Sequence, residues 1–216
     1  MQYKVLKNVL SQEQIESILD FYNEYRHLIE QQDNGWEKLN SPWSFDTIKS
    51  LDSVISQHID TSNNLGDNIY KHTFPYFPHV DTHGGYPCVN VLVPLYVDKP
   101  QKFIIFDQYV KEYTPRTYMG DIKLDKDFKT NTSTTFISED TDVVGLTNKP
   151  IDQKFYNDNL KHEYRTEKMF YGCTGHAVDF TPGDIIIFDS KFIHCTGSML
   201  ADYKIGLSLR FSGEYV

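Results

Sequence analysis

Apolar residues recur at helical spacing in the first third of this chain. Ser11 and Gln14 form a capping-box pattern, which predicts the start of a helix that ends near residue 32. A second helix is expected after Pro42. Its buried stripe consists of Ile48, Leu51, Val54, Ile55 and Ile59. A short strand is also expected over residues 3–10. We therefore expect residues 1–65 to form an N-terminal, mainly helical region that supports the rest of the fold.

The spacing of apolar residues changes to a two-residue alternation after the Asn- and Gly-rich turn at residues 62–68. The strand-like runs are 69–77, 88–96, 102–107, 176–180, 184–188 and 204–211. Between the runs 176–180 and 184–188, Thr181-Pro-Gly-Asp predicts a tight turn. Helices followed by short strands favour a mainly β fold with flanking helices. The spacing fits a double-stranded β-helix, a jelly-roll, cupin-like core packed by the N-terminal helices.

A polar segment over residues 108–170 separates two groups of core strands, 69–107 and 175–213. It is rich in Lys, Asp, Thr and Asn and carries only short apolar patches. A segment of this length without strong periodicity is typical of a lid or binding insertion. Because the sequence contains no repeat and no interdomain linker, we expect residues 1–216 to form a single domain.

Composition narrows the class of partner and the compartment. Aromatic residues make up 14% of the chain, which favours strands around a pocket. The net charge of -9 makes nucleic acid a poor partner, because the surface repels phosphate backbones. The 3 cysteines have no paired spacing, as expected in a reducing cytosol. With no apolar signal core and no run of ~18 apolar residues, we expect a soluble cytoplasmic protein with no membrane partner.

Candidate metal ligands stand out in two distant stretches. His79 and Asp81 occur in the order His-x-Asp, and residues i and i+2 of a strand project to the same face, so one metal can bind both. His194 lies far downstream and can reach that metal only through the fold. Two histidines and one carboxylate occupy one face of an octahedral iron and leave other positions open. We therefore predict that these three residues are the metal ligands and the catalytic centre.

Three stretches of the sequence resemble the Fe(II)/2-oxoglutarate-dependent oxygenase superfamily. Residues 70–81, YKHTFPYFPHVD, are similar to the motif around the first ligands of prolyl 4-hydroxylases. Residues 182–194, from Pro-Gly-Asp to the histidine, resemble the strand-turn-strand before the distal histidine of the superfamily. Residues 204–211, KIGLSLRF, resemble the last core strand of phytanoyl-CoA-hydroxylase-like members. The central insertion is not covered.

The resemblance implies an activity. It implies Fe(II) held by the three ligands, 2-oxoglutarate as co-substrate and O2 as oxidant, with hydroxylation of a substrate C–H bond and release of succinate and CO2. Because halogenating relatives have a small residue where this chain keeps Asp81, hydroxylation is favoured over halogenation. The prolyl-hydroxylase-like motif points to a peptidyl, prolyl target, whereas the last strand points to a small molecule.

The resemblance also implies which residues bind 2-oxoglutarate. Lys204 matches the basic residue that anchors the distal carboxylate, and Tyr70 matches a tyrosine that donates to the same carboxylate. Arg210 is the competing anchor, since a guanidinium is the better fork for a carboxylate, and it shares a strand face with Lys204 and Ser208. Asn90 is polar within an apolar strand and needs a partner if it is buried, either 2-oxoglutarate or another ligand, or ordinary backbone pairing.

Substrate contacts are expected at the pocket rim and in the insertion. The candidates are Tyr76, His83, Tyr109 and Arg116, although aromatic residues of the insertion can equally pack it down. The main alternative is a cupin-like metal-binding protein, or a metal-dependent enzyme, that uses the same three ligands without 2-oxoglutarate. A catalytically silent module with this fold is disfavoured by the complete ligand set.

Overall fold

The computed structural model describes residues 3–31, 36–76, 78–81, 88–111, 143–164 and 167–213. One set of strands is β1 (Tyr3–Leu6), β2 (Glu30–Gln31), β3 (Glu37–Asn40), β4 (Asn64–His72), β5 (Cys88–Val97), β9 (Ile185–Asp189) and β11 (Lys204–Ser212). The other set is β6 (Lys102–Val110), β7 (Val143–Val144), β8 (Gly175–Asp179) and β10 (Phe192–Thr196). The α-helices are α1 (Gln12–Glu24), α2 (Asp46–Lys49), α3 (Asp52–Ile55) and α4 (Gln153–Asn159).

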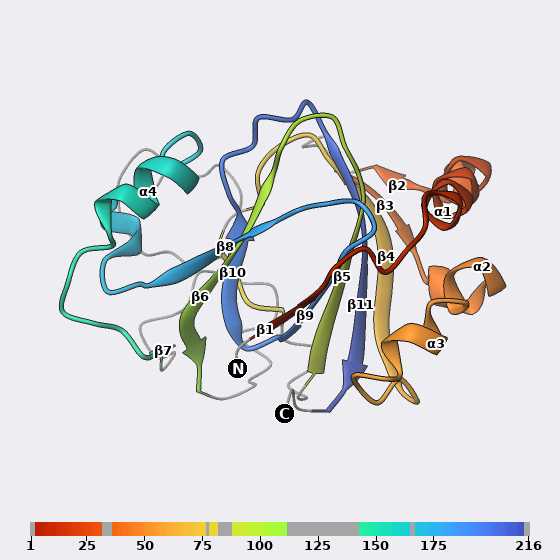
Figure 1. Cartoon of the computed structure of the whole chain (residues 1–216), viewed down its shortest axis with the longest axis horizontal. Helices are drawn as coiled ribbons and strands as arrows, with labels where there is room; N and C mark the ends of the chain where they lie inside the picture. Colours follow the sequence, from red (N-terminus) through yellow and green to blue (C-terminus); the bar gives the residue numbers. More distant parts are fainter. Residues whose placement is uncertain are drawn as a thin grey trace.

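Two antiparallel sheets form the centre of the molecule (Figure 1). The larger sheet has the strand order β1-β9-β5-β11-β4-β3-β2. The smaller sheet has the order β10-β6-β7, and β8 also pairs with β6. This mainly β architecture with flanking helices confirms the predicted fold class.

The first helix begins as predicted and ends earlier. Ser11 Oγ accepts a hydrogen bond from the Gln14 backbone amide at 3.2 Å, and Gln14 Oε1 accepts one from the Ser11 amide at 2.8 Å, which completes the capping box. The predicted end near residue 32 is wrong, because α1 stops at Glu24 and a 3-10 turn, Tyr25–Leu28, follows. The next residues then extend and pair with β3, so ladder hydrogen bonds replace the last helical turns.

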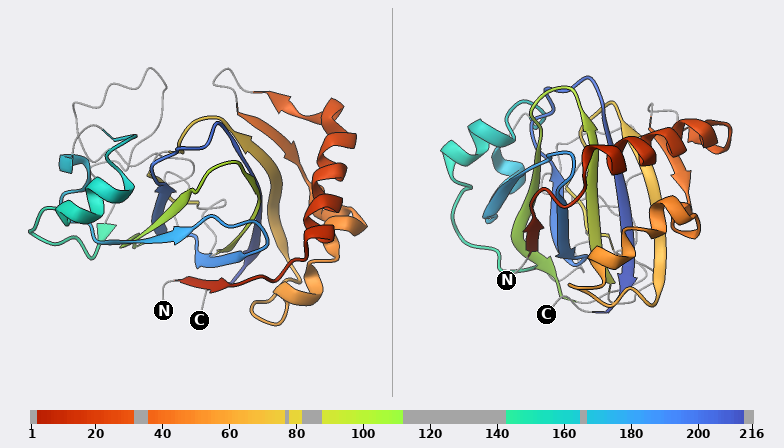
Figure 2. Two further views of the ribbon diagram at one scale, coloured as in Figure 1. Left: turned by 45° about the horizontal axis from the view of Figure 1, so that its top comes forward. Right: turned by 45° about the vertical axis from the view of Figure 1, so that its right-hand side comes forward.

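The second predicted helix is divided into α2 and α3. A 3-10 turn over Pro42–Ser44 precedes them. Their expected stripe is correct, since Ile48, Leu51 and Ile55 are buried. Together with α1 they cover the outer face of the larger sheet, on the side away from the smaller sheet (Figure 2). Hydrophobic burial on this face therefore anchors the sheet whose other face lines the site.

Every predicted strand is present, but the boundaries of two differ clearly, and the strand expected over residues 3–10 is the shorter β1, Tyr3–Leu6. β4 covers Asn64–His72 rather than residues 69–77, because its ladder with β11 runs from Asn64 opposite Phe211 to His72 opposite Lys204. The four strands β2, β3, β7 and β10 were not predicted. Three of them have at most four residues, too few to show a two-residue alternation. β10 has five residues and contains His194.

The turn at Thr181-Pro-Gly-Asp fixes the N-terminal strand against the larger sheet. The Asp184 amide donates to the Thr181 carbonyl at 3.1 Å, as the predicted turn requires. The buried Asp184 carboxylate accepts from Lys7 Nζ at 2.8 Å and from the Asn8 amide at 3.0 Å. This turn therefore ties β1 to the strand that precedes His194.

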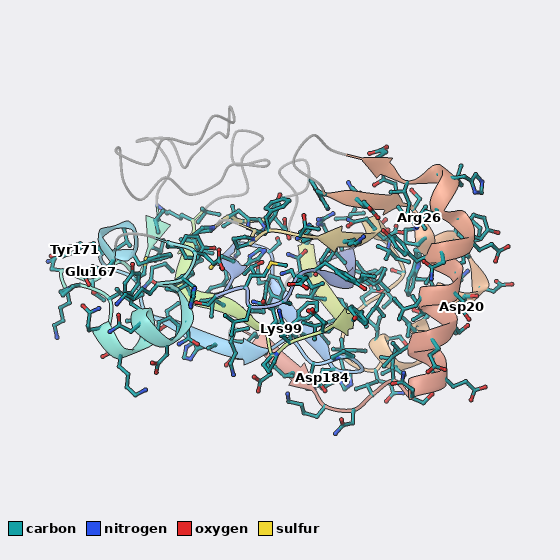
Figure 3. The ribbon with its side chains drawn as sticks, turned by 90° about the horizontal axis from the view of Figure 1, so that it is seen from above. Asp20, Arg26, Lys99, Glu167, Tyr171 and Asp184 are labelled. Atoms are coloured by element: carbon teal, nitrogen blue, oxygen red, sulfur yellow. The ribbon has the colours of Figure 1, made fainter. Side chains whose placement is uncertain are left out.

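Part of the predicted insertion forms a packed layer. Its first residues complete β6, and residues 112–142 lie outside the described residues. Further on, Ile151, Tyr156, Leu160, Tyr164 and Phe170 are buried against β6 and β10. Figure 3 shows Glu167 and Tyr171 at this end of the molecule and Asp20 and Arg26 on the helical layer at the other end. Among the described residues, no helix combines the length and apolar character needed to cross a membrane.

Candidate metal centre

A cavity of about 390 Å³ opens between the sheets, over the inner face of the larger sheet. Alternate side chains of three neighbouring strands line it. The register places Lys204 of β11 opposite His72 of β4, and Gly206 opposite Tyr70, which in turn faces Lys38 of β3. These residues lie on one face because side chains two positions apart project the same way from a strand. The cavity is therefore formed by residues that are far apart in the sequence.

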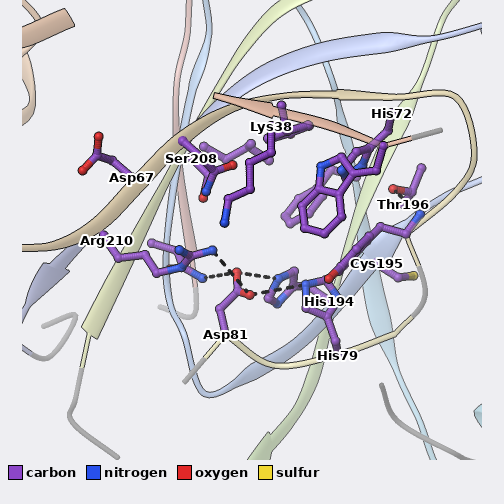
Figure 4. Close-up of a pocket in the computed structure, with 18 of the residues that line it drawn as sticks. Lys38, Asp67, His72, His79, Asp81, His194, Cys195, Thr196, Ser208 and Arg210 are labelled. Atoms are coloured by element: carbon purple, nitrogen blue, oxygen red, sulfur yellow. Dashed lines mark hydrogen bonds and ion pairs between the residues drawn. The ribbon is translucent and has the colours of Figure 1, made fainter. Parts of the chain in front are cut away.

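Three of the predicted residues come together at one end of this cavity. His79 Nε2 lies 3.5 Å from Asp81 Oδ1, and His194 Nε2 lies 3.3 Å from Asp81 Oδ2. One donor atom from each residue can be chosen so that all three lie within 4.8 Å of one another. Figure 4 shows the two imidazoles and the carboxylate converging. Such a cluster suits a single ion with nitrogen and oxygen ligands.

Backbone pairing brings the two histidines side by side. The His79 amide donates to the His194 carbonyl at 3.0 Å, and the His194 amide donates to the His79 carbonyl at 2.9 Å. The Asp81 amide donates to the Ser190 carbonyl at 3.2 Å. The expectation that His79 and Asp81 sit on a regular strand is therefore wrong. They lie on a segment that meets β10 at a single bridge, and this bridge orients them.

A hydrogen bond at Nδ1 of His194 fixes the orientation of the ring and leaves Nε2 free to bind a metal. His194 Nδ1 lies 2.9 Å from the Phe192 carbonyl oxygen, which accepts a hydrogen bond when Nδ1 carries the proton. Nε2 then presents its lone pair toward Asp81, as a metal-binding histidine requires. Burial lowers the pKa of His194, and neighbouring His79 adds to this effect. The neutral imidazole, which is the form that binds metals, is therefore favoured.

Asp81 is held as a carboxylate by its neighbours. Asn90 Nδ2 donates to Asp81 Oδ2 at 3.0 Å, and Arg210 Nη2 lies 3.9 Å from Oδ1. Burial alone would raise the pKa of the Asp81 carboxyl, but Arg210, His194 and His79 together hold it well below its usual range. Asn90, for which sequence left several partners open, is thus bonded to a candidate metal ligand.

Lys204 lies deep in the same cavity without an acidic partner. Its ammonium donates to Thr196 Oγ1 at 2.7 Å and lies 5.2 Å from the centre of the Phe180 ring. No described carboxylate forms an ion pair with it. Burial lowers the pKa of Lys204 to about 7. A buried cation without a counter-ion is costly, so this position is suited to an anionic ligand.

The side chain of His72 lies beside Lys204 and lacks a hydrogen-bond partner among the described residues. It is 6% exposed, and neither ring nitrogen has a hydrogen bond to the described residues. Burial, followed by the charge of Lys204, holds the pKa of His72 well below its usual range. A buried imidazole normally finds at least one hydrogen-bond partner. The orphan nitrogens therefore mark the cavity wall as part of a ligand site.

Tyr70 and Ser208 lie where sequence analysis expected them, in the cavity wall. Tyr70 crosses β11 at Gly206, where an added Cβ would lie 2.5 Å from the Tyr70 hydroxyl oxygen. Only glycine leaves room for this crossing. Burial raises the pKa of Tyr70, so the hydroxyl keeps its proton and can donate it in a hydrogen bond.

The predicted substrate residues are only partly brought together. Tyr76 lines the cavity, and its ring lies 4.4 Å from that of His79. Tyr109 does not line it, because it lies farther along β6 with its ring 5.3 Å from the Phe192 ring. His83 and Arg116 lie outside the described residues.

Several residues that line the cavity were missed by sequence analysis. They are Trp36, Lys38, Asp67, His72 and Thr196. Thr196 and His72 each occur two residues from a residue that had been recognised, so their strand periodicity was an available signal. Lys38 and Trp36 had no such signal, because β3 is short and polar.

Comparison with known proteins identifies the fold. No protein family and no curated protein matches the sequence. The epimerase SnoN, solved in complex with Fe3+, alpha ketoglutarate and nogalamycin RO, is similar in structure, with a TM-score of 0.55 and 11% identity over 98% of this chain and 78% of SnoN. A prolyl-4-hydroxylase of Pseudomonas putida gives a TM-score of 0.54 and 8% identity over 98% of this chain and 92% of that one.

A third similar structure is HygX from Streptomyces hygroscopicus, solved with nickel and 2-oxoglutarate bound. Its TM-score is 0.52, with 11% identity over 98% of this chain and 82% of HygX. Each of the three structural similarities covers nearly the whole of this chain. The protein therefore has the fold of the non-haem 2-oxoglutarate-dependent enzymes, as the sequence resemblance implied.

Proposed function

We propose that this protein is an Fe(II)- and 2-oxoglutarate-dependent dioxygenase that hydroxylates a C–H bond of a small-molecule or peptide substrate. One observation carries the proposal. The His79, Asp81 and His194 cluster shares its cavity with Lys204, a buried cation that lacks an acidic partner among the described residues. A metal with open positions and a nearby carboxylate anchor together meet the needs of 2-oxoglutarate.

The residues present fit both groups. His79, Asp81 and His194 would hold Fe(II) as a two-histidine, one-carboxylate set. Lys204 would bind the distal carboxylate of 2-oxoglutarate, with Thr196 and the Tyr70 hydroxyl beside it. The orphan nitrogens of the buried His72 ring lie in the same wall and would gain a hydrogen-bond partner.

The competing assignment, in which Arg210 anchors the distal carboxylate, is less well supported. Its guanidinium lies 3.9 Å from Asp81 Oδ1, whereas the Lys204 ammonium contacts Thr196 and no described acid. Arg210 is thus already engaged with a metal-ligand candidate. Of these two cations, Lys204 is the one whose charge still needs compensation.

When bound, Fe(II) and 2-oxoglutarate supply the oxidative hydroxylation of a C–H bond by O2, with release of succinate and CO2. The protein's own residues bind, orient and exclude water. Asn90 and Arg210 keep Asp81 ionised and oriented. The Phe188 ring packs against the His194 ring at 4.8 Å, and this aromatic wall keeps solvent from one side of the centre.

A cupin-like metal protein without 2-oxoglutarate is the alternative, and one titration separates the two. Anaerobic apoprotein receives Fe(II) and then 2-oxoglutarate, while the weak visible charge-transfer band of the chelated keto acid is followed. We expect the band in the wild type and in His58→Ala, whose exposed ring contacts Lys4 outside the cavity. We expect it to be lost in His79→Ala and His194→Ala. Iron binding without the band would support the alternative.

A further inference from the structure

Lys38 brings a second ammonium group into the cavity, separate from Lys204. It lies on β3, opposite Tyr70 of β4, and its side chain points into the cavity toward Asp81 (Figure 4). The side chain is half-buried, and no described acid forms an ion pair with it. Burial and then the charge of Arg210 lower the pKa of Lys38, while Glu30, which is opposite it on β2, and Asp81 act in the other direction. The fold therefore holds a half-buried ammonium that makes no ion-pair contact with a described acid and lies near a second cation.

The charges in the cavity wall do not balance. Among the described lining residues, Lys38, Lys204 and Arg210 are cations, whereas Asp67 and Asp81 are carboxylates. The wall thus carries one excess positive charge when Lys204 is protonated. Fe(II) brings two positive charges and 2-oxoglutarate two negative ones, so loading both leaves the excess unchanged. A single negative charge on the substrate would remove it.

The position of Lys38 matches a substrate group rather than the co-substrate. Lys204 lies opposite His72 of β4. Lys38 lies opposite Tyr70 of β4, two positions nearer the metal-binding end, and on β3, the next strand outward. Lys38 Nζ also lies 5.8 Å from the centre of the Trp36 ring, which lines the same wall. An apolar ring beside a cation suits a molecule with a hydrocarbon part and one anionic group.

We propose that the substrate carries a carboxylate and that Lys38 binds it. The substrate class is then a small molecule with a free carboxylate close to the oxidised C–H bond, such as a free amino acid, rather than an internal residue of a peptide. A carboxylate fits better than a phosphate, because the excess is one charge and a phosphate brings nearly two. This inference rests on the proposed oxygenase function.

The test measures substrate binding separately from co-substrate binding. Anaerobic protein is loaded with Fe(II) and 2-oxoglutarate, and formation of the charge-transfer band establishes the oxygenase site. The loaded protein is then titrated with free L-amino acids and simple monocarboxylates, and with their carboxamides, while perturbation of the band is followed. We expect carboxylates to perturb the band and their amides to bind at least about tenfold more weakly, as for loss of a charged hydrogen bond.

Variants of Lys38 attribute the effect to this residue. Lys38→Met keeps the stem that packs near Trp36 and should weaken carboxylate binding about tenfold to a hundredfold, with the band itself intact. Lys38→Arg should restore most of the binding. The control is Lys71→Met, on the opposite face of the neighbouring strand, where Lys71 pairs with Glu37 at 3.5 Å. This control should leave carboxylate binding unchanged.

Failure of the inference is distinguishable from failure of the proposed function. If no band forms in the wild type, the proposed function fails, and the inference fails with it. If the band forms but no carboxylate perturbs it, or if amides bind as well as acids, the inference alone is overturned. Equal carboxylate affinity in wild type and Lys38→Met overturns it too.

Discussion

The side-chain amide of Asn90 donates to Oδ2 of Asp81 at 3.0 Å, from a buried position on β5 directly opposite Arg210 of β11. Arg210 reaches the other carboxylate oxygen from its own strand. Two paired residues on neighbouring strands therefore restrain one candidate metal ligand. Outer contacts of this kind orient a ligand and tune its basicity.

Replacing Asn90 with leucine should weaken metal binding. The variant Asn90→Leu removes the donor to Asp81 while keeping a similar volume, so Fe(II) affinity should fall about tenfold to a hundredfold. Titration of the apoprotein with Fe(II) under anaerobic conditions measures this change. Gln108→Leu is the control, because it removes a buried side chain that donates to the Gly145 carbonyl outside the cavity. An unchanged Fe(II) affinity in Asn90→Leu would show that the contact does not support the metal site.

Removing any one of His79, Asp81 and His194 should abolish iron retention without unfolding the protein. His79→Ala, Asp81→Ala and His194→Ala each delete one donor of a three-donor cluster. Iron content after purification should fall to background, while circular dichroism keeps the β signature. Full iron occupancy in Asp81→Ala would remove that residue from the ligand set.

Loss of Lys204 should affect 2-oxoglutarate more than loss of Arg210. Lys204→Met removes the buried cation that we assign to the distal carboxylate, so 2-oxoglutarate affinity should fall by at least about tenfold. Arg210→Met should act mainly on Fe(II) affinity, through Asp81. Titrations of both variants with 2-oxoglutarate at saturating Fe(II) compare them. The reverse order would transfer the anchoring role to Arg210.

The lowered pKa of Lys204 predicts a pH dependence of 2-oxoglutarate binding. Its pKa falls from 10.5 to about 7 through burial, so the ammonium deprotonates in the unliganded protein as pH rises through 7. Binding a carboxylate requires the charged form, so binding takes up a proton and affinity should decrease above pH 7. Affinities measured across this range test the slope. Lys204→Arg should show a weaker dependence, because a guanidinium stays charged.

The lowered pKa of Lys204 also affects the folding stability of the unliganded protein, which should rise with pH where 2-oxoglutarate affinity falls. Because the pKa is lower in the folded state than in the unfolded chain, the unfolded chain binds more protons between about pH 7 and 10.5. The contribution of Lys204 to folding stability therefore rises with pH in that window. Urea unfolding of wild type and Lys204→Met at several pH values isolates this contribution, and equal pH profiles would contradict it.

Gly206 should not tolerate a side chain. In Gly206→Ala the new Cβ would lie 2.5 Å from the Tyr70 hydroxyl oxygen and 2.7 Å from Cζ, so the ring must move. Overpacking of this kind costs about 1–3 kcal/mol. Urea unfolding measures the loss, and addition of Tyr70→Phe should recover only part of it, because Cζ remains. A fully stable Gly206→Ala would mean that Tyr70 does not cross β11 here.

The motif residues could be predicted because short-range sequence carries their signal. His79 and Asp81 occur as a local pattern, and Lys204 to Arg210 alternate along one strand, so their shared face follows from the two-residue period. The capping box at Ser11 was also local and was correct. Where the prediction failed, as at the end of α1, a hairpin ladder between β2 and β3 competed with local helix propensity.

Periodicity and spacing within a few residues were enough to predict the fold class and the candidate ligands. Only the tertiary structure placed Asn90 and Arg210 at Asp81, and brought Lys38 beside Tyr70 in the cavity wall. These contacts depend on strand order and register, which are set by burial of distant faces against one another. A four-residue polar strand such as β3 has no period of its own, so its place beside β4 could be known only from the folded chain.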